Sequence, residues 1–266
     1  MMRQNYENPH RMVIDVNQSD QYAINAYVAK VFGWMFFGLL LTALTTLGIV
    51  YGTTINENFA NFIFRMQQLV FVVFVIEFAL VIAISARVTK MNPTTAKLLY
   101  ILYAILNGFT FGLFAIIYAY QTGGGIHTLG MAFGLTAVCF GVMAIYGLIT
   151  KSDLTRFGNL LRMGLFGLIF IMIVSFFMRS TMLDFLINIG GLFLFLGITA
   201  HRTQMIKAHY AHIALSSENT YEDEYGYTRQ SALASNLAIY GALTLYLAFI
   251  NMFMFIMRLM GGGSRR

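Results

Sequence analysis

Long, uninterrupted runs of apolar residues dominate this chain. Seven stretches hold about 20 mostly apolar residues each, the length that an α-helix needs to cross a bilayer. They cover approximately residues 31–52, 67–86, 96–120, 126–149, 160–178, 182–201 and 236–259. The apolar residues are continuous and do not alternate with a period of two, so the pattern predicts helices instead of a β-barrel. The first six runs are clear, whereas the seventh also carries polar residues such as Tyr240 and Asn251.

These runs predict an all-α, polytopic membrane protein with seven transmembrane helices. We expect a polar N-terminal tail over residues 1–30 and a membrane domain over residues 31–259. Within that domain, the one sizeable polar loop is expected at about residues 202–235, and a short tail follows over residues 260–266.

Composition supports a membrane protein. Of 266 residues, 58% are hydrophobic and only 11% are charged, and the mean hydropathy is +0.70. Soluble domains carry about 25% charged residues, so these charges are too few to cover a water-soluble surface. The lipid bilayer is therefore the expected partner. The net charge is +6, but the basic residues lie between the apolar runs, so we expect no nucleic-acid partner.

The basic residues predict how the chain is oriented. One side of a seven-span bundle would carry twelve of them: Arg3, Arg11, Lys30, Arg87, Lys90, Lys97, Lys151, Arg156, Arg162, Arg202, Lys207 and Arg229. The other side would carry five: Arg65, Arg179, Arg258, Arg265 and Arg266. Because cytoplasmic loops are enriched in Lys and Arg, we expect a cytoplasmic N-terminus and an external C-terminus. A re-entrant seventh run would instead place both termini in the cytoplasm, and the charge distribution leaves that alternative open.

Glu77 is the main candidate for chemistry, because it lies near the middle of the second apolar run. A charge deep in a bilayer costs at least ~2.5–3.5 kcal/mol, so it persists only when it faces a partner, water or the protein interior. Glu77 is therefore either a carboxylate that handles protons or cations, or a structural residue held by one polar partner. Arg87, at a helix end, and Asn251, in the last run, are weaker candidates for a cation or proton pathway.

Other features favour structural roles. Gly108 and Gly112, and likewise Gly130 and Gly134, have the spacing that lets helices approach closely in lipid. The acidic stretch at residues 218–224 is expected to be a solvated loop or short helix, with a cation site as the lesser alternative. No HExxH, Walker lysine, GxSxG or dinucleotide-binding motif occurs. We therefore expect neither an enzyme nor a cofactor or metal centre.

Several segments together resemble the Bax inhibitor-1 family, which includes bacterial members. They are VFGWM at residues 31–35, GLLLTA at 38–43, NGFT at 107–110, GLITKSDLT at 147–155, TAHRTQMI at 199–206 and GALTLYLAFIN at 241–251. The matches fall in order at corresponding ends of the spans and cover nearly the whole apolar region. The resemblance implies a seven-helix fold with the last helix in the centre.

The same resemblance implies a function in ion leak or regulation. Members of the family are linked to calcium leak, to pH sensing and to restraint of stress responses, and some bacterial members modulate a membrane protease. Two family aspartates that share a proton correspond to Arg202 and Ala248 here. An arginine and an alanine cannot share a proton as two close carboxylates can, so the pH sensor of the family is expected to be lost.

Two functions remain open at this stage. The first is a leak channel for calcium or protons, which the family fold and Glu77 favour. The second is a non-conducting regulator that binds a membrane protease or transporter, which the lost aspartates favour. We further hypothesise an ion pair between Glu77 and Arg202 that closes the cytoplasmic end. The resemblance to bacterial members suggests a location in the bacterial inner membrane.

Overall fold

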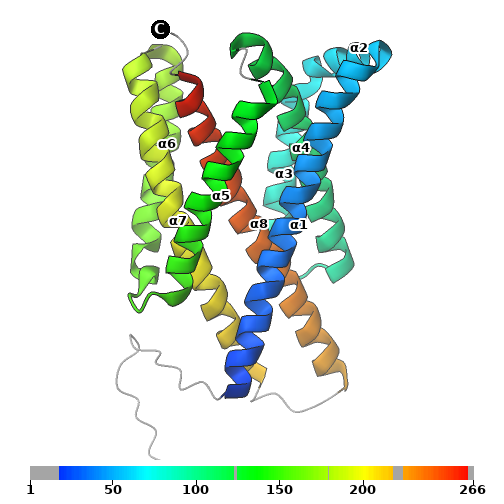
Figure 1. The fold of residues 1–266 in the computed structure, drawn as a ribbon. Coiled ribbons are helices and arrows are strands. Elements are labelled where there is room, and N and C mark those ends of the chain that lie inside the picture. The colour runs from blue at the N-terminus through cyan, green and yellow to red at the C-terminus, as the bar shows by residue number, and fades with distance from the viewer. Residues whose placement is uncertain (1–17, 123–124, 179, 218–223, 263–266) are drawn as a thin grey trace, which may run out of the picture.

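The computed structural model describes residues 18–122, 125–178, 180–217 and 224–262, and these residues form helices joined by short connections (Figure 1). The α-helices are α1 (Gln18–Ile55), α2 (Glu57–Met66), α3 (Val70–Arg87), α4 (Pro93–Thr122), α5 (Gly125–Ile149), α6 (Gly158–Met178), α7 (Thr181–Ser217) and α8 (Glu224–Gly262). Two short 3-10 turns are η1 (Gln67–Leu69) and η2 (Leu154–Phe157). Seven of the described helices are long and apolar enough to cross a membrane. The predicted all-α, seven-span fold is confirmed.

Helix α8 lies at the centre of the bundle, as the family resemblance implies. In Figure 1 it runs obliquely between a group formed by α1, α3 and α4 and a group formed by α5, α6 and α7. It packs against α1, α4, α5 and α7. Of its most apolar 18-residue stretch, 67% is buried inside the protein. The seventh span is a single unbroken helix over residues 232–261, so the re-entrant alternative is wrong.

The sequence of α8 explains its central position. Small residues such as Ala238 and Ala242 alternate with Leu243 and Tyr246, and all four side chains are fully buried. Small side chains let neighbouring helices approach closely, and larger ones fill the space between them. By contrast, only 11% of the most apolar 18-residue stretch of the α3 span is buried inside the protein, and only 6% of that of the α6 span. Their exposed side chains are mainly Phe, Ile, Val, Leu and Met, which suits contact with lipid.

The helices extend further than the apolar runs suggested. Helix α1 begins at Gln18, within the segment expected to be a tail. Helices α7 and α8 extend to Ser217 and from Glu224, so most of the expected loop at residues 202–235 is helical. Polar residues continue a helix once an apolar segment has nucleated it, which is why hydropathy alone placed these ends too early. Helix α2 was also not predicted. The acidic residues 218–223 lie outside the described residues.

The two glycine pairs behave differently. A Cβ atom on Gly108 would lie 2.6 Å from Thr45 Cβ and 2.7 Å from the carbonyl oxygen of Thr42, so this glycine permits close packing of α1 and α4. Gly112 similarly faces Ile49 at 3.0 Å. Gly130 and Gly134 have no atom within 4 Å of such a Cβ, so the packing role predicted for them is wrong. Spacing alone does not say which way a helix face points.

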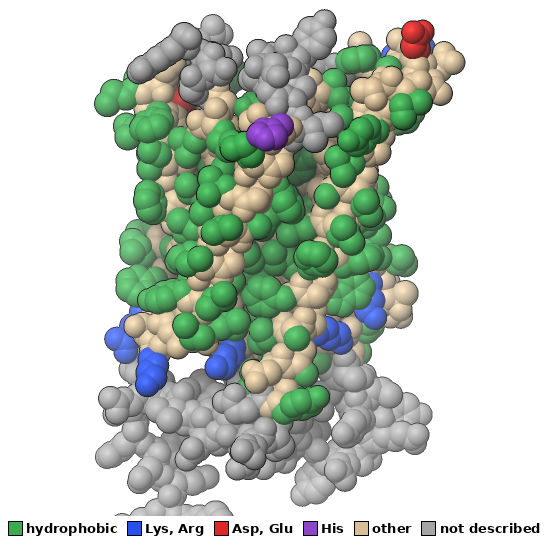
Figure 2. Space-filling model, in the orientation of Figure 1, with side chains coloured by type: hydrophobic (Ala, Val, Ile, Leu, Met, Phe, Trp, Pro, Cys, Tyr) green, Lys and Arg blue, Asp and Glu red, His purple; other side chains and the backbone are tan. Residues whose placement is uncertain are grey.

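The ends of the bundle differ in charge. On the face shown in Figure 2, Lys and Arg side chains gather near the end at which α1 and α8 begin. We call this the basic end. Among the described residues, the ends of α3, α5 and α7 and the starts of α4 and α6 lie there as well, because successive spans alternate in direction.

Candidate functional site

Glu77 is one of two residues of α3 that are buried, with 7% of its surface exposed. Its neighbours along the helix, such as Val75, Ile76 and Phe78, are exposed apolar residues. The glutamate thus faces α4, where the hydroxyl of Thr110 donates a hydrogen bond of 2.6 Å to Oε1. A buried carboxylate that accepts a hydrogen bond loses less free energy on leaving water than an unpaired one.

A polar group lies beside Glu77 in the bundle interior. The Thr42 hydroxyl on α1 lies 2.7 Å from the Tyr246 hydroxyl on α8 and 2.9 Å from the carbonyl oxygen of Ala104 on α4. Because that carbonyl can only accept, Thr42 can donate to it and accept from Tyr246. Tyr103 packs edge-on against Tyr246, with ring centroids 5.6 Å apart, and both tyrosines interact electrostatically with Glu77.

We call Glu77, Thr110, Thr42, Tyr103 and Tyr246 the Glu77 cluster. It joins α1, α3, α4 and α8, so the cluster links the central helix to the group on one side of it. Sequence reasoning identified Glu77 but none of its four neighbours as functional candidates. Thr42 and Thr110 lie in the segments GLLLTA and NGFT. Polar residues inside these family-like segments could therefore have been chosen as candidates from the sequence.

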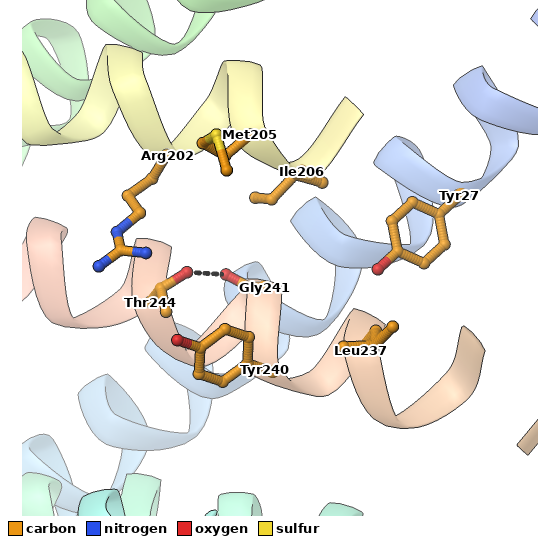
Figure 3. Close-up of a pocket in the computed structure, with 8 residues that line it drawn as sticks. All are labelled: Tyr27, Arg202, Met205, Ile206, Leu237, Tyr240, Gly241 and Thr244. Atoms are coloured by element: carbon orange, nitrogen blue, oxygen red, sulfur yellow. Dashed lines mark hydrogen bonds between the residues drawn. The ribbon is translucent and has the colours of Figure 1, made fainter. Parts of the chain in front are cut away.

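Arg202 lies elsewhere, in a small pocket between α1, α7 and α8 (Figure 3). The pocket is near the basic end, because it uses the last part of the α7 span and the first part of the α8 span. Its neighbours there include Tyr27, Met205, Tyr240 and Thr244. No acidic residue lines the pocket, and the Thr244 hydroxyl donates to the carbonyl oxygen of Gly241 in its own helix. In Figure 3 the guanidinium group and the Tyr240 hydroxyl point towards the same space.

The hypothesised ion pair between Glu77 and Arg202 does not form. Among the described residues, the ion pair present joins Arg156 to Asp153 at 3.4 Å. Helix α3 packs mainly on α4, and Glu77 lies roughly 15 Å from Arg87 at the basic end of α3, at 1.5 Å per residue. Glu77 instead bonds to Thr110, so depth and lateral position both separate it from Arg202.

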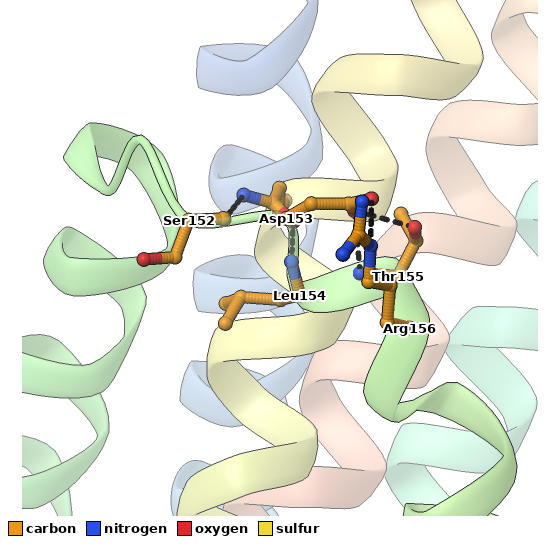
Figure 4. A network of polar contacts seen from close by, with 6 residues as sticks. Ser152, Asp153, Leu154, Thr155 and Arg156 are labelled. Atoms are coloured by element: carbon orange, nitrogen blue, oxygen red, sulfur yellow. Dashed lines mark hydrogen bonds and ion pairs between the residues drawn. The ribbon is translucent and has the colours of Figure 1, made fainter. Parts of the chain in front are cut away.

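The turn between α5 and α6 is tied to α7 beside Arg202. Gln204 accepts a 2.8 Å hydrogen bond from the backbone N–H of Leu154 and donates one of 2.8 Å to the carbonyl oxygen of Ser152. Within the turn, the hydroxyl and backbone N–H of Thr155 donate to the Asp153 carboxylate, and this lowers the pKa of that carboxyl (Figure 4). The segments GLITKSDLT and TAHRTQMI thus meet in space.

The remaining candidates do not join either group. Arg87 is exposed at the end of α3. The Asn251 side chain donates to the carbonyl oxygen of Leu247 in its own helix. Ala248 is 1% exposed in the packed core, and its own side chain has no ionisable group. Among the described residues, no three His, Cys, Asp or Glu side chains come close enough to hold a metal ion.

Comparison with known proteins identifies the family. The family model described as "Inhibitor of apoptosis-promoting Bax1" matches residues 24–265. This chain belongs to the Bax inhibitor-1 family. The match covers every described transmembrane span from near the start of α1 to the end of α8, so it confirms the resemblance found in the sequence segments.

Bacterial relatives cover the same length. An uncharacterized protein of Borreliella burgdorferi is 35% identical over 251 residues, which is 94% of this chain and 98% of the relative. The inner membrane protein YbhL of Escherichia coli K12 is 33% identical over 239 residues, or 90% and 92% of the two chains. An uncharacterized protein of Deinococcus radiodurans is 33% identical over 242 residues, or 91% and 92%. The protein is therefore a bacterial-type member of the Bax inhibitor-1 family and an integral membrane protein.

Proposed function

We propose that this protein is a leak pathway for protons or calcium and that Glu77 is the group that accepts them. The observation that carries the proposal is the burial of Glu77 with a hydroxyl donor and, among the described residues, no cationic partner. An ionisable side chain inside a transmembrane bundle marks an ion or proton route more often than it marks packing alone. A proton or a bound cation would supply the missing positive charge.

In this proposal the structure is the closed conformation of the leak pathway. On the basic side of the Glu77 cluster, α8 presents Ile239, Ala242 and Leu243, all with 0% exposure. Flux would require α8 to shift against α1 or α4. Breaking the bond between Thr42 and Tyr246 is the expected first step, because it is the polar contact between α1 and α8 beside Glu77.

The test is flux in proteoliposomes loaded with a calcium or pH dye, at several pH values. We expect pH-dependent flux that Glu77→Gln abolishes and that Asp184→Asn retains. Asp184 is a matched control because it is also an acidic residue of a transmembrane helix, and its carboxylate also accepts a hydrogen bond from a hydroxyl, that of Ser175. Unlike Glu77, Asp184 is exposed and lies near a helix end. Flux no greater than that of protein-free liposomes at every pH would refute the leak.

A non-conducting regulator is the second candidate. It is favoured by Arg202 and Ala248 at the positions of the family aspartates, and by the broad apolar faces of α3 and α6, which could contact a membrane protease or transporter. The variant carrying both Arg202→Asp and Ala248→Asp separates the two candidates. Flux that appears only in this double variant would mean that the scaffold can conduct and that the natural sequence acts as a regulator. Neither candidate involves catalysis or a cofactor.

We also propose that the basic end faces the cytoplasm of a bacterial inner membrane. Support comes from the position of the Lys and Arg side chains in Figure 2 and from the positive-inside rule. The test uses Cys139→Ala, which removes the single cysteine, with new cysteines at Lys151 or Glu57. An impermeant thiol reagent added to intact spheroplasts should label the cysteine at position 57 and not the one at 151; the reverse pattern would invert the orientation.

A further inference from the structure

Arg202 is a charged group without a protein counter-ion in a largely apolar setting. It lies within the transmembrane span that covers residues 181–208, and its side chain is half-buried. In the described part of the chain, the guanidinium group takes part in no ion pair or hydrogen bond. A charged group at partial burial is costly unless a partner of opposite charge compensates it.

The residues that line the pocket around Arg202 include hydrogen-bond donors but no negatively charged side chain. Tyr240 is a second unpaired donor there, since its hydroxyl has no hydrogen bond to any described residue. Tyr27, stacked on Tyr210 with ring centroids 4.6 Å apart, forms another wall. The empty space at the pocket is about 280 Å³, a volume that includes open solvent. A site with two free donors, one of them the positively charged Arg202, and no carboxylate among its lining residues is complementary to an anion.

The geometry points to an anion site for a phosphate group, held by Arg202 and Tyr240. A guanidinium group presents paired N–H donors that match two phosphate oxygens, and such charge-assisted bonds are stronger than neutral ones. The site lies towards the basic end, because its residues lie in the last part of the α7 span and the first part of the α8 span. That end faces lipid headgroups in a membrane, so the phosphate can come from an anionic lipid or from free phosphate in solution.

This site shares no residue with the Glu77 cluster, although α1 and α8 contribute to both. The pocket adds residues of α7, whereas Glu77 and its hydroxyl donor come from α3 and α4. It also gives a role to the arginine that replaces a family aspartate. A carboxylate at position 202 would attract a cation and repel a phosphate, so the replacement changes the sign of the preferred ligand.

The experiment is thermal unfolding of the full-length protein in nanodiscs, with two separate arms. In the lipid arm, phosphatidylglycerol is increased in a phosphatidylcholine nanodisc in buffer without phosphate. In the solution arm, inorganic phosphate is titrated onto the protein in a pure phosphatidylcholine nanodisc at constant ionic strength. We expect a saturable rise in Tm in one arm, and the arm that responds identifies the source of the phosphate group.

The variants decide whether the rise depends on the pocket. Arg202→Gln should weaken the apparent affinity roughly ten- to hundred-fold, as the loss of a charge-assisted bond implies. Tyr240→Phe should weaken it less, by about three- to tenfold, from the loss of one neutral hydrogen bond. Arg162→Gln is the matched control, because Arg162 is an exposed arginine in the first part of α6, which begins at the basic end. This control should leave the titration unchanged.

Three results would overturn the proposal. One is the absence of a saturable Tm change in both arms. A second is an equal loss in Arg202→Gln and Arg162→Gln, which would indicate general attraction to a basic surface. The third applies if Arg202→Gln does not fold. In that case Tyr240→Phe and Arg202→Lys carry the test, and titrations of both that match the natural protein would exclude the site.

Discussion

The Glu77 cluster and the Arg202 pocket show two ways in which this bundle accommodates a charged residue. Glu77 lies deep in the bundle, and neighbouring helices supply its hydrogen-bond donor and its aromatic surroundings. Arg202 lies towards the basic end, where described side chains give it no hydrogen bond or counter-ion. The protein thus supplies a hydrogen-bond donor to its buried acid, whereas described side chains supply no hydrogen bond or opposite charge to Arg202.

The largest expected effect comes from forcing apart the helices that form the Glu77 cluster. Gly108→Leu places a side chain where even a Cβ would lie 2.7 Å from the Thr42 carbonyl oxygen. Overpacking of this kind costs roughly 1–3 kcal/mol or more, and we expect most of the folded protein to be lost. The measurement is the yield and Tm of monodisperse protein in detergent.

Gly130→Leu is the control for that change. It adds the same side chain at a glycine with open space around it, so its Tm should stay within a few degrees of the natural protein. Equal damage from the two substitutions would mean that α4 does not pack on α1 as described.

The next effect tests whether Glu77 depends on a protein donor. Thr110→Val keeps the shape of the side chain but removes the hydroxyl that donates to Glu77. Leaving a buried carboxylate without this bond should cost about 1–3 kcal/mol. Thr136→Val is the control, because Thr136 is also buried but bonds to the backbone of its own helix. If both variants unfold at the same temperature, the bond to Glu77 contributes nothing measurable.

A smaller effect is expected beside the Arg202 pocket. Gln204→Leu removes both hydrogen bonds that hold the turn between α5 and α6 to α7. The expected result is faster amide hydrogen exchange in residues 152–157, with a loss of about 1 kcal/mol or less in global stability because the turn is exposed. Exchange that is unchanged in this turn but faster around Glu77 would show that the two regions are coupled.

The smallest effect concerns pH. Thr155 lowers the pKa of the Asp153 carboxyl, so this group stabilises the folded state above its unfolded pKa of about 3.9. The stabilisation is lost as the pH falls through the lower folded pKa. Asp153→Asn should therefore lower the free energy of unfolding at neutral pH by a few tenths of a kcal/mol at most, because the turn is exposed. Tm should fall slightly, and the difference from the natural protein should vanish in acid. A difference that grows in acid would contradict this sign.

Much of this fold could be predicted because a bilayer imposes simple requirements on sequence. Seven apolar runs of the necessary length became seven spans, and the ordered family-like segments identified α8 as the central helix. The partner of Glu77 could not be predicted in the same way. Thr110 lies 33 positions away, and whether its hydroxyl faces α3 depends on the rotation of α4, which hydropathy does not encode.

The incorrect predictions have related physical causes. The ion pair between Glu77 and Arg202 was suggested by charge alone, but the two residues lie at different depths and on helices that pack against different neighbours. Gly130 and Gly134 have the right spacing but an exposed position. Helix ends were misplaced because α1, α7 and α8 continue into polar residues beyond the apolar runs, and hydropathy detects only the apolar part of each helix.

The central position of α8 has a consequence for the order of events during synthesis. The ribosome makes a protein from its N-terminus, so α8 is the last of the described helices to enter the membrane. Until then α1, α4, α5 and α7 have no common helix to pack against, and Thr42 has no Tyr246 to bond. The pairs α1 with α4 and α5 with α7 can pack before then, but they lack their shared central helix, so closure of the bundle is a late, post-insertion step.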